Sequence, residues 1–271
     1  MVQFTAACIQ LNSQDDLGAN MRALESLVRK AAKKGAVFIA LPENALFMQE
    51  PGKGAPPRGD AAIRHCGKLA RELKVWLLMG SVQVPSGTGK SLNRSLLIDD
   101  TGKIAARYDK IHLFDVTLKK GETYSESARI EGGAEAVIAH TPWGRLGMTV
   151  CYDLRFPHLY RTLAQAGAEF LSVPSAFTYT TGTAHWHTLL RARAIENGCY
   201  VFAPAQCGQH PAKRRTYGHS LIVSPWGEIL AEGSEDKTGI ITAKIDTDKI
   251  REARAMIPSL RHDRAFGLQT Y

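Results

Sequence analysis

The stretch that decides the fold lies between residues 5 and 43, where three segments read TAACIQL (5–11), LGANMRALESLVRKAAKK (17–34) and VFIALPE (37–43). The first and third contain short apolar runs, which predict buried strands. The second carries apolar residues at the spacing of one helix face, namely Met21, Leu24, Leu27, Val28 and Ala31. A strand, a helix and a strand in this order indicate an α/β fold.

The rest of the chain repeats this alternation without a linker. We expect helices at residues 61–73, 157–166 and 185–197. We expect strands at residues 75–80, 91–98, 104–109, 136–140, 145–150, 170–174, 201–205 and 221–224, further strands up to residue 245, and a Pro/Gly-rich loop at 51–59. The two halves share a pattern rather than a sequence. The pattern predicts one domain over residues 1–271, with weak internal two-fold symmetry and two sheets packed face to face beneath outer helices.

The net charge of +8 comes from 34 Lys and Arg against 26 Asp and Glu, scattered along the chain. Nucleic-acid-binding proteins usually gather basic residues on an arm or a stripe. The densest cluster, Lys213-Arg214-Arg215, is short and lacks interleaved aromatic residues, which indicates a solvated loop or, alternatively, a device that steers anions. The composition therefore favours a small anionic substrate and no nucleic acid.

The five cysteines are odd in number and show no CxxC spacing, unlike a secreted disulfide scaffold. The N-terminus has no basic segment followed by an apolar core, as a signal peptide would. The longest apolar runs fall far short of the roughly 20 residues that span a bilayer. These features predict a cytoplasmic protein that does not insert into a membrane.

Three reactive side chains follow predicted strand ends, where ligands gather in layered α/β folds. Cys151 follows the run Gly147 to Val150, Glu43 follows 38–42, and Lys110 follows 104–109. A carboxylate beside a thiol can take its proton, and burial would raise the pKa of that carboxylate towards the working range. Lys110 could balance the two negative charges and stabilise an oxyanion. The alternatives are a buried structural cysteine and an ordinary ion pair at the rim of a sheet.

A histidine-assisted cysteine is the competing chemistry, because the chain has nine histidines. His185 and His187 flank Trp186 at an expected helix start, so only one of them can face a given site. His219 precedes a strand, and no HExxH or CxxC spacing is present. We therefore expect neither a metal nor a cofactor.

Three blocks resemble the catalytic blocks of the nitrilase, or carbon-nitrogen hydrolase, superfamily: LPE at 41–43, YDKIHLF at 108–114 and CYDLRFP at 151–157. TGTAHW at 181–186 and PWG at 225–227 extend the resemblance over nearly the whole chain. It implies a four-layer αββα sandwich, a Glu-Lys-Cys triad formed by Glu43, Lys110 and Cys151, and a homodimer or a larger homo-oligomer. It also implies that Glu126 is a second active-site glutamate that orients Lys110 or the attacking water, with Glu122 as a weaker candidate.

Tyr152-Asp153 stands where true nitrilases have Trp-Glu, which favours amide over nitrile hydrolysis. The segments LRARAIE (190–196), AQCG (205–208) and RTYGHS (215–220) resemble the deaminated glutathione amidase branch. This resemblance implies cleavage of the terminal carboxamide of a small anionic amide through a cysteine thioester, with release of ammonia. An omega-amidase acting on alpha-ketoglutaramate or alpha-ketosuccinamate is the alternative, followed by a nitrilase or an inactive binding relative.

The resemblance also suggests which residues bind the substrate. Arg155 would hold a substrate carboxylate, because a guanidinium pairs with a carboxylate through two hydrogen bonds. Thr181, in the loop that follows, and Tyr217 are further candidates, and His219 borders the same region. The structural alternative is a salt bridge from Arg155 to Asp153 or to an acidic residue at an interface.

Overall fold

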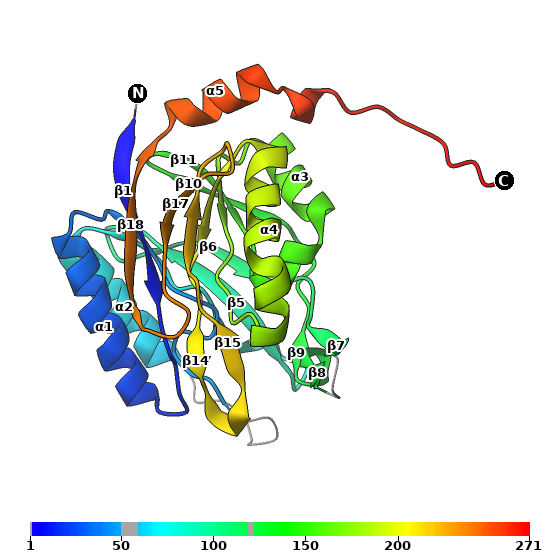
Figure 1. The fold of residues 1–271 in the computed structure, drawn as a ribbon. Helices are drawn as coiled ribbons and strands as arrows, with labels where there is room; N and C mark the ends of the chain where they lie inside the picture. Colours follow the sequence, from blue (N-terminus) through cyan, green and yellow to red (C-terminus); the bar gives the residue numbers. More distant parts are fainter. Residues whose placement is uncertain (1, 50–58, 119–121) are drawn as a thin grey trace.

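The computed structural model describes residues 2–49, 59–118 and 122–271, so the expected loop at 51–59 lies almost wholly outside it. Two large sheets stack between two pairs of helices, and the C-terminal segment extends away from them (Figure 1). Among the described residues, no helix is long and apolar enough to cross a membrane.

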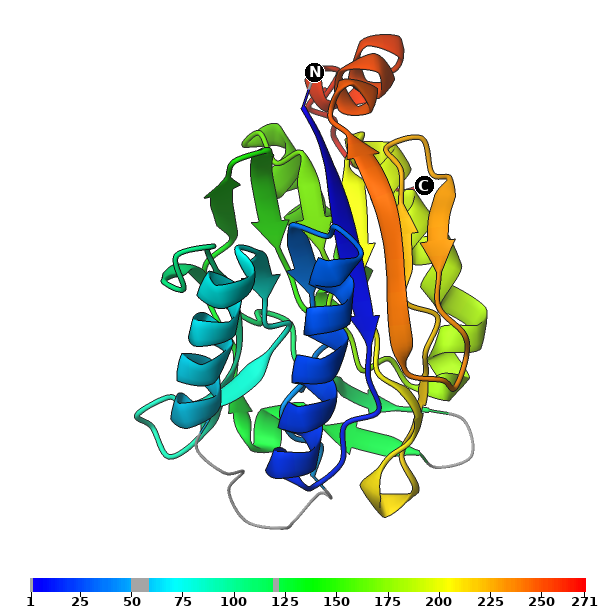
Figure 2. The same ribbon diagram turned by 90° about the vertical axis from the view of Figure 1, so that its left-hand side faces the viewer.

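The first sheet has the strand order β18-β1-β2-β3-β5-β4, with β6 and β9 also paired to β5. Its strands are β1 (Gln3–Gln10), β2 (Phe38–Ala40), β3 (Trp76–Leu78), β4 (Val82–Pro85), β5 (Ser91–Ile98), β6 (Ile104–Asp109), β9 (Ile130–Glu131) and β18 (Gly239–Asp246). Two helices, α1 (Leu17–Lys33) and α2 (Asp60–Leu73), cover its outer face, as Figure 2 shows from the helix side.

The second sheet has the order β10-β11-β12-β13-β16-β17. Its strands are β10 (Val137–Thr141), β11 (Gly144–Met148), β12 (Phe170–Ser172), β13 (Tyr200–Ala203), β16 (Leu221–Val223) and β17 (Ile229–Glu232). Helices α3 (Pro157–Gln165) and α4 (Tyr179–Asn197) cover it, and α5 (Asp248–Met256) follows β18. Two small hairpins complete the chain: β7 (Asp115–Thr117) with β8 (Thr123–Ser125), and β14 (Cys207–Gln209) with β15 (Arg215–Tyr217).

Side-chain alternation along the strands builds the layers. In β1, Phe4 and Cys8 face the core between the sheets, whereas Ala7 and Ile9 face the core beneath α1 and α2. Because successive side chains of a strand point to opposite faces, a strand buried on both faces is apolar at nearly every position. The structure therefore confirms the four-layer αββα sandwich.

The expected two-fold symmetry is visible in the topology. Strands β1, β2 and β3 run parallel and are followed by antiparallel β5. Strands β11, β12 and β13 run parallel and are followed by antiparallel β16. Each parallel pair is joined by one helix, so both halves repeat the same right-handed crossover unit.

Helix α4 begins at Tyr179, six residues before the expected start. The threonines at its beginning are weak helix formers, which hid this turn in the sequence. Tertiary contacts support it: the indole nitrogen of Trp186 donates to the carbonyl of His219 at 2.7 Å, and the backbone of Gly182 lies against the Tyr217 side chain. The placement of Thr181 in a loop was therefore wrong, because this residue lies in the first turn of α4.

Candidate active site

The three strand-end residues meet where the two sheets end. Glu43 lies just after β2, Lys110 directly after β6, and Cys151 after β11 of the opposite sheet; all three are buried. The Lys110 Nζ atom is 3.0 Å from Glu43 Oε1. A direct interaction also links the side chains of Glu43 and Cys151. The chain thus brings a thiol, a carboxylate and an ammonium group into one buried cluster.

Glu126 completes the cluster from the other side of Lys110. Its two oxygens lie 3.1 Å and 2.8 Å from Lys110 Nζ, and the Phe114 backbone N–H donates to it at 2.7 Å. Glu122 lies elsewhere, where it accepts hydrogen bonds from the hydroxyls of Tyr124 and Thr180. Of the two candidate glutamates, Glu126 contacts Lys110, as an orienting role requires, and Glu122 bonds other side chains.

Sequence reasoning missed Asn93, which lies in the middle of β5 and is buried. Its Nδ2 atom donates to Glu43 at 3.0 Å and to Glu126 at 3.2 Å. The second oxygen of Glu43 accepts from the Ala176 backbone N–H at 2.9 Å. The sequence offered only a weak signal, an amide side chain in the strand SLNRSLLI, which also contains two serines and an arginine. Asn93 therefore holds both carboxylates in place around the ammonium group.

The protonation states follow from this geometry. Burial acts against the charge of Lys110, but the two glutamates outweigh it and hold the Lys110 pKa well above its usual value. Burial pushes the Glu43 pKa up, yet Lys110 and the hydrogen bonds bring it below its usual value. Burial and the negative charge of Glu43 raise the pKa of Cys151. The expectation of a raised Glu43 pKa was wrong, because the attraction of Lys110 and the hydrogen bonds to the carboxylate outweigh the effect of burial.

Cys151 adopts a conformation that non-glycine residues rarely take, with φ at +49°. Its N–H donates to the Pro174 carbonyl of the neighbouring strand end at 3.0 Å. Strained backbone of this kind clusters at functional sites, where the surrounding structure fixes it. The turn is thus held to present the thiol towards Glu43 and Lys110.

Asp153 anchors that turn to the Lys110 segment. Its fully buried carboxylate accepts from the Tyr108 hydroxyl at 2.7 Å, the Val150 N–H at 2.8 Å, and both the N–H and the ring Nδ1 of His112. These contacts occupy the carboxylate, so the alternative of a salt bridge to Arg155 was wrong. Asp153 instead fixes the distance between the Cys151 and Lys110 segments.

Arg155 lies beside aromatic rings. Its guanidinium carbon is 5.9 Å from the centre of the Tyr152 ring and 5.2 Å from that of Phe177, and its Nη1 atom is 3.2 Å from His185 Nδ1. Within residues 2–49, 59–118 and 122–271, no carboxylate lies within ion-pair distance of it. Its charge is therefore available for an anion.

Thr181 lies on α4 and Tyr217 on β15, outside the charged cluster. The Thr181 hydroxyl is 2.8 Å from that of Thr178, and the Tyr217 ring contacts those of Tyr179 and His219. In the described part of the chain, neither forms a hydrogen bond with the catalytic candidates. Both belong to the wall formed by the start of α4 and the β15 strand.

The three side chains of the basic cluster at residues 213–215 have different surroundings in the structure. Lys213 is exposed, and Arg215 pairs with Glu235. Arg214 turns inward, where its Nη2 atom donates to the Ala176 carbonyl at 3.0 Å. The interpretation as a solvated loop holds for Lys213 but fails for Arg214, which packs against the residue that bonds Glu43.

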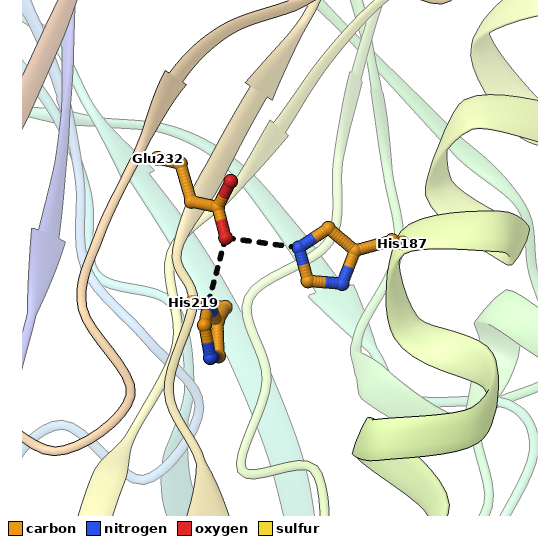
Figure 3. A group of neighbouring side chains, drawn as sticks. All are labelled: His187, His219 and Glu232. Carbon is orange, nitrogen blue, oxygen red and sulfur yellow. Dashed lines mark hydrogen bonds and ion pairs between the residues drawn. The ribbon is translucent and has the colours of Figure 1, made fainter.

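His187 on α4, His219 before β16 and Glu232 on β17 form a second polar cluster. Figure 3 shows both rings directed at one carboxylate oxygen, with Glu232 Oε1 at 3.0 Å from His187 Nε2 and 2.7 Å from His219 Nδ1. Two imidazoles and a carboxylate are ligand types that suit zinc. However, the facing atoms already satisfy one another as hydrogen-bond partners, so the cluster acts as a bridge that ties α4 to the edge of the second sheet.

Comparison with known proteins places this site in a family. The carbon-nitrogen hydrolase profile matches residues 5–255. The chain is 42% identical to a deaminated glutathione amidase of Synechocystis sp., covering 97% of this chain and 98% of the relative. It is 41% identical to that of Homo sapiens, covering 95% and 81% respectively. The crystal structure of the C. elegans NitFhit protein matches with a TM-score of 0.88 at 39% identity; the match covers 97% of this chain but 65% of that one, less than two thirds. This chain therefore belongs to the carbon-nitrogen hydrolase family.

Proposed function

We propose that this protein is an amidase that hydrolyses deaminated glutathione, with Cys151 as nucleophile, Glu43 as general base and Lys110 as charge stabiliser. The observation that carries the proposal is the buried cluster in which Lys110 joins Glu43 and Glu126 beside the Cys151 thiol. The names of the relatives from Synechocystis sp. and Homo sapiens support the substrate.

The charge states support a nucleophile that is activated during attack. Glu43 has a lowered pKa and Cys151 a raised one, so the resting pair is a carboxylate and a neutral thiol. As sulfur attacks the amide carbon, the thiol proton passes to Glu43 and an oxyanion forms. Lys110 Nζ and a backbone N–H near the nucleophile stabilise that oxyanion. The N–H of Cys151 itself already donates to Pro174, so the N–H of Tyr152 is the next donor along the chain.

Collapse of this intermediate breaks the carbon-nitrogen bond, and Glu43 transfers its proton to the leaving nitrogen. The resulting thioester on Cys151 is then hydrolysed by water, with Glu43 again accepting a proton. Glu126 bonds Lys110 through both oxygens, which supports a role in orienting the ammonium group. Asn93 would hold both carboxylates throughout the cycle.

The chemistry of the substrate defines the leaving group. Deaminated glutathione is an alpha-keto acid joined by an amide bond to cysteinylglycine, so it has a carboxylate at each end. Its cleavage releases the amine of cysteinylglycine, so the expected terminal carboxamide and release of ammonia do not apply to this substrate. They apply to a primary amide such as alpha-ketoglutaramate. Arg155, which has no carboxylate within ion-pair distance among the described residues, would bind the carboxylate of the keto acid. Thr181 and Tyr217 would contribute to the wall around it.

Steady-state kinetics on the two substrates test the proposal, because both yield alpha-ketoglutarate and can be followed by one coupled assay. We expect the higher kcat/KM with deaminated glutathione. A higher kcat/KM with alpha-ketoglutaramate would identify an omega-amidase. A chain that hydrolyses neither compound and forms no acyl-enzyme with them, detected by mass spectrometry of the intact protein, would contradict the assignment.

We further propose that residues 1–271 form one domain that assembles as a homodimer or a larger homo-oligomer in the cytoplasm. All five cysteines are free, which suits a reducing compartment. The edge strand β17 exposes Ile229 and Leu230, and Ile195 and Trp226 are half exposed, which supports an apolar contact surface. Sedimentation equilibrium would test the assembly, and a monomer at micromolar concentration would contradict it.

A further inference from the structure

Arg214 carries a hydrogen-bond donor without a partner. Its Nε atom is buried and forms no hydrogen bond within the described residues, although the Nη2 atom of the same group donates to the Ala176 carbonyl. The guanidinium carbon lies 5.7 Å from the centre of the Tyr124 ring. Buried donors are nearly always satisfied in native proteins, because leaving one unpaired costs its full desolvation penalty. The unpaired donor therefore leaves a place for an acceptor, which a bound water or a ligand would supply.

Ala176 connects this guanidinium with the reacting atoms. Its carbonyl accepts from Arg214 at 3.0 Å, and its N–H donates to Glu43 Oε2 at 2.9 Å. Glu43 must transfer a proton to the leaving nitrogen, so that nitrogen has to lie beside Glu43. Arg214 is thus connected to Glu43 through a single intervening residue, Ala176.

The turn before Arg214 is built to hold it in this position. Ala212 and Lys213 have φ values of +58° and +60°, so two consecutive non-glycine residues adopt the left-handed conformation. His210 at the base of the turn is buried, and its Nδ1 atom lies 2.8 Å from the carbonyl of Ser13. Strain of this kind persists only where the surrounding structure imposes it, and it is common at ligand clamps.

We propose that Arg214 forms a carboxylate subsite that binds the far end of the leaving group, which in deaminated glutathione is the glycine carboxylate. This inference rests on the proposed function. The Nε edge of a guanidinium matches a carboxylate through two parallel hydrogen bonds. A two-residue leaving group extends about 7 Å from its nitrogen, so its far carboxylate lies well beyond Glu43. Arg155 binds the carboxylate at the keto acid end, so each of the two substrate carboxylates has its own arginine.

The test compares three substrates in the wild type, in Arg214→Gln and in the control Lys213→Gln. Lys213 lies next to Arg214 and is exposed, so the control removes the same charge without touching the subsite. The substrates are deaminated glutathione, the same compound with its glycine carboxylate capped as an N-methylamide, and alpha-ketoglutaramate. The last two keep the keto acid half but lack the second carboxylate.

For Arg214→Gln we expect kcat/KM with deaminated glutathione to fall about 10- to 100-fold, the loss of one charged hydrogen-bonded pair. The two substrates without the second carboxylate should change little, and capping should cost the wild type a similar factor. Lys213→Gln should alter each value by less than about threefold, as expected for an exposed charge.

Equal losses on all three substrates, or no loss on any, would overturn the subsite while leaving the proposed function intact. If the thermal melt shows that Arg214→Gln does not fold, the wild type tests the subsite with the capped compound. A kcat/KM for the capped compound equal to that for deaminated glutathione would overturn the subsite. A wild-type protein that cleaves only alpha-ketoglutaramate would instead overturn the proposed function together with the subsite that depends on it.

Discussion

Replacement of Lys110 by methionine should destabilise the protein and abolish turnover. The Nζ atom lies 3.0 Å from Glu43 and 2.8 Å from the nearer oxygen of Glu126. At an effective dielectric constant of 20, unit charges at about 3 Å attract by about 5 kcal/mol, but the buried ammonium group also loses several kcal/mol of hydration. Removing it leaves the buried carboxylate of Glu43 and the partly buried carboxylate of Glu126 without their shared cation. The expected net loss in free energy of unfolding is about 3–5 kcal/mol.

Urea denaturation at neutral pH would measure that loss, with hydrolysis of deaminated glutathione measured in parallel. The double variant Lys110→Met/Glu126→Gln is the matched control, because it removes one of the two opposed charges. We expect it to regain part of the lost stability but none of the activity. Wild-type stability in Lys110→Met would refute the electrostatic argument, and restored turnover in the double variant would refute the catalytic one.

The pH dependence gives the same prediction an independent readout. In the wild type, the pKa of Glu43 is lower in the folded protein than in the unfolded chain. Ionised Glu43 therefore adds to the free energy of unfolding above its pKa in the unfolded chain, and this stabilisation is lost as the pH falls through its pKa in the folded protein. Without Lys110, burial raises the pKa of Glu43 in the folded protein above its value in the unfolded chain. The dependence of stability on pH then has the opposite sign, and the free energy of unfolding falls as the pH rises. The deficit of Lys110→Met should therefore shrink on acidification. A deficit that is constant with pH would contradict the assigned charges.

Four further outcomes are expected. Cys151→Ala should have no measurable turnover while its circular dichroism spectrum and melting curve stay close to those of the wild type; normal turnover would exclude Cys151 as the nucleophile. In the pH profile of kcat/KM, the acid limb should lie below the usual glutamate range, because the Glu43 pKa is lowered, and a limb that rises through the thiol range would point instead to a preformed thiolate. Asp153→Ala should lower the free energy of unfolding by about 3–5 kcal/mol, since it leaves several buried donors unpaired, and an unchanged urea midpoint would contradict its anchoring role. Gly182→Ala should destabilise the start of α4, because a Cβ atom there would meet the Tyr217 side chain at 2.3 Å; a thermal melt equal to that of the wild type would show that the two elements can separate.

The layered fold was largely predictable, because burial on both faces of the sheets leaves a continuous apolar signature in each strand. The strands that escaped prediction are short or lie outside the main repeat, such as β4, β7 and β14. Their few residues carry no periodic signal. The early start of α4 was missed for a related reason, since contacts to the second sheet outweigh the weak helix propensity of its threonines.

The charged cluster was predictable only as a set of residues. The meeting of Glu43 and Lys110 was expected because both follow strand ends, and the structure confirms it. Asn93 and Arg214 were missed. The sequence shows that Asn93 lies in a strand and Arg214 in a basic cluster, but it does not show which neighbouring groups their polar atoms contact. The shift in the Glu43 pKa could not be predicted for the same reason, because its direction depends on Lys110, which lies 67 positions away in the sequence.

The amino-acid sequence by itself determined the alternation of strands and helices and the αββα layering, and it singled out Cys151, Glu43 and Lys110 as the candidate nucleophile, base and cation. These follow from local periodicity and from residue identity at strand ends. Only the tertiary structure decided how Asn93 and Asp153 hold that set together, which way the Glu43 pKa moves, and that Arg214 turns inward with an unpaired donor. The physical reason is that electrostatic and hydrogen-bond energies depend on distances between atoms that are far apart along the chain.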